Sequence, residues 1–376
     1  MLLLNTGYAY ERALLAGISR YSQLHGPWMF VRETPYWEKD SRNMRERLKQ
    51  VNGIILIEGP LLDEIRRLRI PCVVSNYLTE KIEGLPNIVS DHRAMGEMAA
   101  RHLIERGFKH FGFCGYPGLF WSDQRLEGFE RVVTQAGGIV DHYVPPIAGG
   151  RLQRTKEQKS LELWLKALPK PVGLMACIDE RGQQVAEVCN SASLMIPDQV
   201  AIIGVNNDEL ACTLSNIPTS SVAISAEQSG FEAAACLHSL MLGQRLKTDK
   251  ILVHPTHVVV RLSTNIIAVA DPHVAHAVNF IQNACKKPLY VNDVAKAVGL
   301  SRRVLEKRFR VSLNRTIHEQ IRKSRISVIT QMLIDSAMSV SEIALSTGFS
   351  DATHIARYFR TETGVSLSEY RRQNHS

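Results

Sequence analysis

The sequence lacks the features that mark several simple classes of protein. Its seven cysteines are scattered, odd in number and free of any Cys-x-x-Cys pair, so neither a disulfide framework nor a cysteine zinc motif is indicated. No stretch reaches the ~18 uninterrupted apolar residues of a membrane helix. The start, Met1 to Leu4, has no basic segment like that of a signal peptide. We therefore expect a cytoplasmic protein with reduced core cysteines, no metal, no cofactor and no membrane contact.

Motifs of common enzymes are missing as well. The chain contains no Gly-x-Gly-x-x-Gly, Walker A, Gly-x-Ser-x-Gly or His-Glu-x-x-His sequence. Carboxylates are present, but nothing in their spacing pairs two of them as general acid and base. An α/β enzyme with an attached DNA-binding arm is thus an alternative that the sequence disfavours, and we expect no enzymatic activity.

Charge is unevenly distributed along the 376 residues. The formal net charge is +8, and residues 272–376 hold 16 of the 45 basic residues but only 8 of the 37 acidic ones. The whole positive excess therefore lies in this segment, and residues 1–271 are neutral overall. A local basic surplus is typical of a segment that binds a polyanion, although basic tails also meet membranes and acidic proteins.

The hydrophobic pattern divides the chain into two architectures. Up to residue 263, short apolar runs alternate with amphipathic stretches, which predicts an α/β fold with a mainly parallel sheet, in one large lobe or two similar ones. The expected strands are Gly53–Ile57, Pro71–Ser75, Asn87–Ser90, His110–Cys114, Val172–Ile178 and Val200–Val205. The expected helices are Arg93–Arg106, Gln124–Ala136, Gly182–Ala192 and Glu227–Leu242. We place a linker at 264–271 and an all-α domain at 272–376, which opens on the helix-starting pair Asp271-Pro272.

The C-terminal part contains a repeat. The pattern Val-x-x-Val-Ala-x-x-x-Gly-Leu-Ser at 291–301 returns as Val-x-x-Ile-Ala-x-x-x-Gly-Phe-Ser at 340–350. Each copy indicates a short helix, a glycine turn and a serine that caps a second helix, because glycine tolerates the left-handed conformation that ends a helix. Ser339 and Glu342 add a capping box to the second copy. This order predicts two helix-turn-helix units.

The second helix of each unit is expected to enter the major groove of DNA. It runs over about 302–311 in unit one and 351–362 in unit two, with Phe309 and Phe359 facing the core. Side chains on the other faces are then available to bases or phosphates. These are Arg302, Arg303, Glu306, Lys307 and Arg310 in unit one, and Asp351, Ala352, Thr353, His354 and Arg357 in unit two.

A spacer of about 22 residues, from Asn314 to Asp335, separates the units and is expected to be helical. Its apolar stripe is Ile317, Ile321, Val328 and Met332. Such a helix is about 33 Å long, close to the ~34 Å between successive major grooves on one face of a duplex. A lone basic helix would most simply be a solvated face, but two matched units at this spacing favour DNA binding.

The closing stretch of the chain carries a family signature. It runs from Gly348-Phe349-Ser350-Asp351 through Arg357-Tyr358-Phe359-Arg360 to Glu369-Tyr370-Arg371. With it, residues 272–376 resemble the AraC/XylS-type DNA-binding domain, which implies double-stranded DNA as a partner. Ile355 stands where that family usually has an aromatic residue and Leu367 where it usually has proline, and both keep an apolar side chain.

Four short stretches of the large domain also match a family. They are Asp91 to Arg106, Arg125 to Phe129, Ile178-Asp179 with the later Ile196-Pro197, and Val200 to Asp208. In this order and spacing they resemble the LacI/GalR-type effector domain, which is similar to periplasmic sugar-binding proteins. The resemblance implies a two-lobed α/β domain over 1–263, a sugar ligand and a homodimer, and it makes Leu2–Asn5 the remnant of a first strand.

Candidate sugar contacts lie just past the C-terminal ends of expected strands, where α/β sheets bind ligands. Arg125 can hydrogen-bond several hydroxyl groups, and by resemblance it falls on the arginine that holds sugar in LacI-type domains. Trp121 lies one helical turn earlier, and its ring suits the apolar face of a pyranose. The other candidates, for which a structural role such as a helix cap is the alternative, are Tyr10, Glu11, Asp91, Asp179, Asn207 and Asp208.

These expectations together describe a sugar-responsive transcription regulator. A LacI-like sensor before an AraC-like DNA reader resembles bacterial regulators of pentose catabolic genes. The resemblance makes D-xylose the first candidate for the sugar. It also implies an activator of transcription, with RNA polymerase as a partner. Another pentose or a hexose stays open, because pocket polarity does not fix stereochemistry. A purely architectural DNA binder whose large domain only dimerises is disfavoured by the pairing of Trp121 with Arg125.

Overall fold

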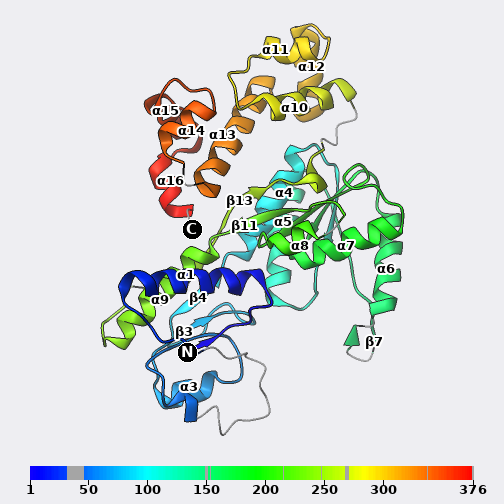
Figure 1. Ribbon diagram of the computed structural model, residues 1–376. Helices are drawn as coiled ribbons and strands as arrows, with labels where there is room; N and C mark the ends of the chain where they lie inside the picture. The colour runs from blue at the N-terminus through cyan, green and yellow to red at the C-terminus, as the bar shows by residue number, and fades with distance from the viewer. Residues whose placement is uncertain are drawn as a thin grey trace.

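The computed structural model describes residues 1–31, 46–148, 151–152, 154–214, 216–246, 248–266, 271–336 and 338–374. An α/β part of two lobes lies below an all-α part in Figure 1. This is the predicted fold class, and the choice between one lobe and two is decided by two separate sheets. Residues 267–270 of the predicted linker lie outside the described residues.

The first lobe is built on a parallel sheet with the strand order β1-β2-β3-β4-β12. Its strands are β1 Leu2–Leu3, β2 Ile54–Ile57, β3 Cys72–Ser75, β4 Asn87–Ser90 and β12 Lys250–Val253, and its helices include α1 Ala9–His25, α3 Leu62–Leu68 and α9 Ala226–Met241. Ile55 and Val73 face the core formed with α1 and α9, whereas Ile54 and Val74 face the core on the side of α3. Helices therefore cover both faces, as the continuous apolar strands predict.

The second lobe has a sheet with the order β13-β11-β10-β9-β5-β6, in which only the pair of β11 with β13 is antiparallel. The strands are β5 His110–Cys114, β6 Val140–His142, β9 Val172–Ala176, β10 Val200–Val205, β11 Ser220–Ile224 and β13 Pro255–Val259, and a small ladder joins β7 Ile147–Ala148 to β8 Arg151–Leu152. The helices are α4 His92–Glu105, α5 Phe120–Gln135, α6 Arg154–Ala167, α7 Asp179–Ser191, α8 Glu209–Thr213 and the 3₁₀ turn η1 Leu262–Thr264.

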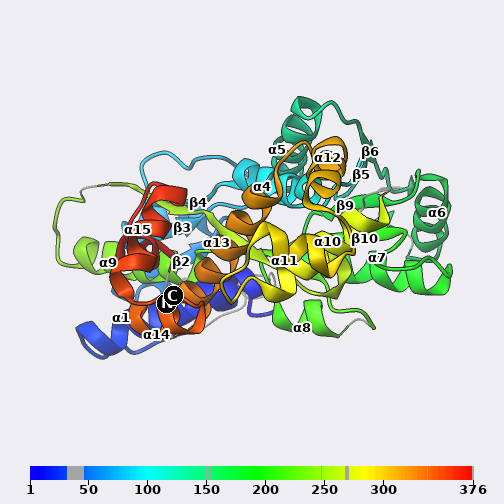
Figure 2. The ribbon, with the colours of Figure 1, turned by 90° about the horizontal axis from the view of Figure 1, so that it is seen from above.

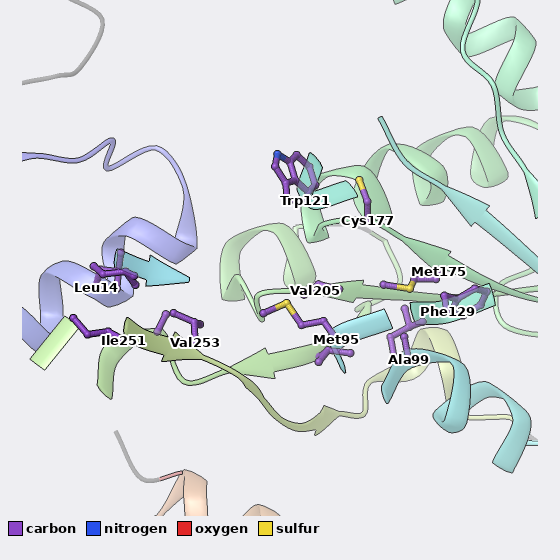
Figure 3. Close-up of a cluster of buried hydrophobic side chains, with 14 of the residues drawn as sticks. Leu14, Met95, Ala99, Trp121, Phe129, Met175, Cys177, Val205, Ile251 and Val253 are labelled. Carbon is purple, nitrogen blue, oxygen red and sulfur yellow. The ribbon is translucent and has the colours of Figure 1, made fainter. Parts of the chain in front are cut away.

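The chain crosses between the lobes three times, after β4, after β11 and after β12. The crossings are tied to one another, because the backbone amide of Asp91 donates to the carbonyl of Val253 at 2.8 Å and that of Ser225 to the carbonyl of His254 at 3.0 Å. One buried apolar cluster continues across this junction. Figure 3 shows it, with Leu14, Ile251 and Val253 on the side of the first lobe and Ala99, Phe129 and Met175 on that of the second.

All six predicted strands and all four predicted helices of this part are present, with ends that differ by a few residues. The strand β6 and the short ladder of β7 and β8 were not predicted, and neither were the strands β11, β12 and β13. The last three are short and carry polar residues, and in β12 buried and exposed residues alternate, so no long apolar run marks them. Thr264, the first residue of the predicted linker, is buried in the α/β part and hydrogen-bonds Ser220 through its hydroxyl group at 2.7 Å.

The all-α part consists of seven described helices. They are α10 Pro272–Ala284, α11 Val291–Ala297, α12 Arg302–Leu313, α13 Ile317–Asp335, α14 Val340–Ser346, α15 Ala352–Thr363 and α16 Leu367–Asn374. Asp271 caps α10 by accepting from the amides of residues 273 and 274, as predicted. Ser301 and Ser339 cap α12 and α14 as predicted, whereas Asp351, and not the serine of the repeat at 350, caps α15. Figure 1 shows one unit at each end of α13.

Two details of the predicted spacer are wrong. Residues 314–316 are not helical, because Asn314 ends α12 in the left-handed conformation and Thr316 caps α13. The helix therefore has 19 residues and is about 28 Å long. Its stripe also changes face: the first half buries Ile317 and Ile321 in the core of unit one, and the second half buries Ile329 and Leu333 in the core of unit two. Of the two residues predicted for the second half, Met332 packs against that core partly buried and Val328 does not belong to it. One helix serves two cores that lie at different angles around its axis.

Candidate functional site

A cavity of about 400 Å³ lies between the two lobes, at the C-terminal ends of their strands. This volume is within the range of about 300–1,000 Å³ that ligand pockets occupy. The first lobe contributes Tyr8, Tyr10, Glu11, Asn76, Tyr77 and Ser90. The second lobe contributes His92, Tyr116, Leu119, Trp121, Arg125, Ile178, Glu180, Gln184 and Asn206. A ligand here would touch both lobes at once.

Arg125 and Trp121 lie together on the wall that α5 forms. The guanidinium carbon of Arg125 is 5.3 Å from the centroid of the Trp121 ring, and both side chains are buried. Arg125 donates to the carbonyl of Cys177 and to the side-chain oxygen of Asn206, at 3.4 Å for the latter. Burial lowers the pKa of Arg125 to about 10, so the group still carries its charge at neutral pH. The predicted placement of the two residues one turn apart on one wall is confirmed.

Several buried polar atoms around this cavity have no partner within the described part of the chain. They are Asn76 Oδ1, His92 Nδ1, Trp121 Nε1 and Arg125 Nε, and all four residues line the cavity. A buried polar group without a hydrogen bond is costly, and such atoms are rare in folded proteins. Their gathering around one cavity fits a ligand with both donor and acceptor groups, as a polyhydroxyl compound has.

The charges around the cavity are set by burial. Burial raises the pKa of Glu11 to about 7 and also raises that of Glu180. Burial, and then the nearby Arg125, hold the pKa of His92 well below its usual value, so His92 is neutral at pH 7. A neutral imidazole has one donor and one acceptor nitrogen. The lining thus offers one fixed cation, two acids and neutral polar groups.

Of the eight sugar contacts predicted, Tyr10, Glu11, Trp121 and Arg125 line the cavity and the other four do not. Asp91 caps α4 by accepting from the amide of Ala94. Asp179 accepts from the amide of Asp208 at 2.7 Å. Asp208 caps α8 and pairs with Arg12 at 2.6 Å. Asn207 accepts from Arg261 at 2.8 Å. These four residues position the loops behind the cavity.

Some lining residues were missed although their neighbours were selected. Glu180, not Asp179, lines the cavity, because α7 begins at Asp179 and consecutive helical residues point about 100° apart. Asn206, not Asn207, lines it, because both residues have positive φ and the turn after β10 sends their side chains in different directions. Proximity to the C-terminal ends of strands correctly indicated these loops, but it does not determine which of two consecutive residues points into the cavity.

Asp179 has a testable consequence for stability. Burial raises the pKa of Asp179 to about 7 in the folded protein, above the value in the unfolded chain. The folded state therefore favours the protonated carboxyl group, and this stabilisation is lost as the pH rises from about 4 through 7. Asp179→Asn keeps an oxygen for the amide of Asp208 and removes the charge. We expect the variant to gain up to about 3–4 kcal/mol over the parent protein between pH 5 and 8, measured by urea unfolding at each pH. The exposed Asp198→Asn is the control, and parallel pH profiles for parent and Asp179→Asn would contradict the prediction.

The recognition helix of unit one, α12, presents a basic face. Leu305 and Phe309 are fully buried beneath it. Of the predicted contacts, Arg302, Arg303, Lys307 and Arg310 are exposed and Glu306 is half-buried, and Arg308 is a further exposed cation that pairs with Asp271. Glu306 accepts from Arg302 at 2.8 Å, so these two predicted DNA contacts form an ion pair with each other. This pair, together with Lys307 and Arg310, lines a hollow of about 460 Å³ between α12 and the start of α13, whereas Arg303 does not.

The recognition helix of unit two, α15, is arranged in the same way over Ile355 and Phe359. Thr353, His354 and Arg357 are exposed and Ala352 is half-buried. Asp351 is exposed but caps the helix, since its carboxylate accepts from the amide of residue 354 at 2.8 Å. That hydrogen bond lowers the pKa of Asp351. The carboxylate therefore orders the helix start that would meet DNA.

Other kinds of site were sought among the described residues. All seven cysteines are free thiols. The described side chains include no group of three or more His, Cys, Asp or Glu residues that could hold a metal ion. No helix within the described ranges is long and apolar enough to span a bilayer.

Two family models match the chain. A periplasmic binding protein-like domain matches residues 100–264, and a helix-turn-helix domain matches residues 294–373. The first match falls mostly on the second lobe and the second on the helices from α11 to α16. Both architectures expected from the sequence are therefore confirmed.

Some proteins are similar to this chain over nearly all of its length. The xylose operon regulatory protein of Escherichia coli (strain K12) is 31% identical, over 99% of this chain and 96% of that protein. The protein of the same name from Haemophilus influenzae is 28% identical, over 98% and 97%. A solved structure of a xylose-binding transcription activator, xylR, is 29% identical with a TM-score of 0.62, over 100% of this chain and 98% of that one.

Proposed function

The chain belongs to the family of the xylose operon regulatory proteins, and from this premise we propose that it is a sugar-responsive transcription regulator. Residues 1–263 form the sensor, 264–271 the linker and 272–376 the DNA-binding domain. The regulator acts in the cytoplasm as a homodimer that activates transcription through RNA polymerase. The effector is D-xylose, and a different monosaccharide is the alternative.

The observation that carries the sugar site is the buried Arg125 stacked on Trp121, in a cavity where several polar atoms lack partners. The indole covers the apolar face of the sugar ring, and the guanidinium donates to two or more hydroxyl groups. Asn76 and His92 supply further acceptors and donors, and Tyr10 and Glu11 close the site from the first lobe. Because both lobes contribute, sugar favours the closed arrangement of the lobes.

Lobe closure is the step that links sugar to DNA. A sugar that touches both lobes binds the closed state more tightly than the open one, and only this difference in affinity can shift the balance between states. The three crossings between the lobes are where the chain bends on closure. In the homodimer, closure changes how the paired DNA-binding domains are presented to the operator.

The experiment that tests the function is operator affinity with and without D-xylose at one fixed salt concentration. Salt is fixed because phosphate contacts make DNA affinity strongly salt-dependent. We expect a change in affinity of about 5- to 150-fold, the usual range of coupling between two sites. A panel of pentoses and hexoses, scored by thermal shift, then tests the choice of D-xylose. If no sugar raises the melting temperature, the sensor role is wrong and the architectural alternative gains support.

The DNA face yields a second prediction. Arg303 is exposed at the start of α12, so Arg303→Ala should weaken operator binding about tenfold or more, because an arginine that reads a base contributes about 1–3 kcal/mol. If Arg303 instead contacts a phosphate, affinity falls for all DNA sequences, and the slope of log affinity against log salt concentration becomes smaller in magnitude by about one. The assay is a salt titration on operator and on random DNA. Arg67→Ala, an equal loss of charge on α3, is the control, and unchanged operator affinity in Arg303→Ala would exclude the assigned role.

A further inference from the structure

Helix α4 extends from the sugar cavity to the DNA-binding domain. Its first residue, His92, lines the cavity, and its last residue, Glu105, contacts α13. The 14 residues of the helix span about 21 Å. Figures 1 and 2 agree that α4 lies on the side of the sensor that faces the all-α part. One rigid element thus meets both functional regions.

Helix α4 moves together with α5, because their backbones are in direct contact. A Cβ atom on Gly96 of α4 would lie 2.0 Å from the carbonyl oxygen of Arg125, and a Cβ on Gly128 of α5 would lie 2.0 Å from that of Arg93. Only glycine permits so close an approach. Since α5 carries Trp121 and Arg125, the helix pair holds three of the cavity's side chains as a single body.

The last turn of α4 is fastened to α13 and to the turn before it by a cluster that we call the interdomain clamp, made of Glu105, Arg315 and Lys323. The carboxylate of Glu105 accepts from Lys323 at 2.7 Å, and the backbone carbonyl of Glu105 accepts from Arg315. Nearby, Arg106 donates to the carbonyl of Thr264 at 2.7 Å, which ties the start of the linker to the same turn.

The clamp is one of several contacts between the two parts on this side, since α13 also lies against β13. Beside the clamp, a mostly polar hollow of about 500 Å³ lies between α4, β13, α10 and α13, so the two parts are not tightly packed at that point. A second tie is weaker: the hydroxyl group of Tyr370 donates to the carbonyl of Thr256 at 3.4 Å. Polar contacts of this kind exchange between two arrangements without the loss of a packed core.

Helix α13 passes any movement on to both recognition helices. Ile317 and Ile321 anchor it in the core that holds α12. Arg322 pairs with Glu362 of α15 at 3.0 Å, and Arg325 donates to the carbonyl of Thr347 before α15 at 2.8 Å. A shift of the end of α4 relative to α13 therefore reorients both DNA-reading surfaces.

We propose that the interdomain clamp transmits the sugar signal: the α4–α5 pair moves as the cavity closes, and Glu105 moves Arg315 and Lys323 with it. The proposal deepens the proposed function and rests on it. The free energy of sugar binding reaches DNA only to the extent that the clamp differs between the open and closed states. Removing the clamp uncouples the two activities without removing either one.

The test is the double variant Arg315→Gln/Lys323→Gln, in full-length protein with operator DNA and D-xylose. In this variant the operator affinities with and without sugar should agree within about twofold, unlike those of the parent. By reciprocity, operator DNA should also cease to alter D-xylose affinity. D-xylose affinity without DNA should stay within about twofold of the parent. The matched control, Glu162→Gln/Lys166→Gln, removes an ion pair of 2.6 Å on α6 and should keep the parent's ratio of affinities with and without sugar.

Hydrogen exchange gives a readout that does not need DNA. In the parent, D-xylose should change the exchange rates of amides in 317–335, and in the double variant it should change those in 92–105 only. If sugar alters α13 equally in both proteins, or if the affinity ratio of the variant equals that of the parent, the clamp is not the route. If the parent itself shows no sugar effect on operator affinity, the proposed function fails instead.

Discussion

Replacing Arg125 with alanine is expected to abolish the sugar response and to leave sugar-free operator binding unchanged. Arg125 is buried in the cavity wall, its Nε has no partner among the described residues, and its pKa of about 10 keeps it charged. A hydrogen bond from a charged group contributes about 1.5–3 kcal/mol, so the loss of two such bonds to hydroxyl groups predicts at least a 100-fold loss of sugar affinity. Isothermal calorimetry with D-xylose measures the first effect, and operator titration measures the second.

Two further substitutions separate the binding role of Arg125 from a structural one. Arg125→Met keeps the bulk against Trp121 but has no donors, so it should lose sugar affinity as fully as the alanine variant. Arg131→Ala removes an exposed arginine of the same helix, paired with Glu97, and should bind sugar normally. Sugar affinity in Arg125→Met within tenfold of the parent would contradict the assignment, as would loss of operator binding in Arg125→Ala.

The DNA-binding domain could be predicted closely because its determinants are local. Ser301 and Ser339 cap helices in the structure as the sequence pattern indicates, and Gly299 and Gly348 take the positive φ that the turns require. In unit two the second helix begins one residue later than predicted, because Asp351 and not Ser350 is its cap. Each of these features depends on a few consecutive residues. The face of α13 could not be predicted in this way, since it depends on two cores that the sequence does not place in space.

The sugar site shows the same division. Trp121 and Arg125 share a helix, so their spacing alone brings them together. The opposite wall, with Tyr10 and Glu11, comes from the other lobe, and its approach depends on three crossings of the chain. Asp208 illustrates the limit: it follows a strand as a ligand contact should, but Arg12 of the first lobe pairs with it and keeps it out of the cavity lining.

Replacing Phe359 with alanine is expected to unfold unit two and to cost at least about 100-fold in operator affinity. Phe359 is fully buried in a small core, and its truncation costs about 3–5 kcal/mol. A core of that size supplies rarely more than about 3–5 kcal/mol, so little stability remains. Without α15, one recognition helix remains for an operator that two helices are expected to contact. D-xylose affinity should stay unchanged because the sensor has its own hydrophobic cores.

The repeat supplies an internal comparison for this prediction. Phe309 occupies the corresponding position in unit one, is equally buried and packs in a separate core, so Phe309→Ala should cause a loss of similar size. Thr361→Ala changes an exposed residue of α15 and should stay within about twofold of the parent. Footprinting of the operator should show protection lost over one groove in Phe359→Ala and over the adjacent groove in Phe309→Ala. If both variants lost the same groove, or if Phe359→Ala kept full affinity, the two units would not read adjacent grooves, because independent cores on one spacer helix must fail independently.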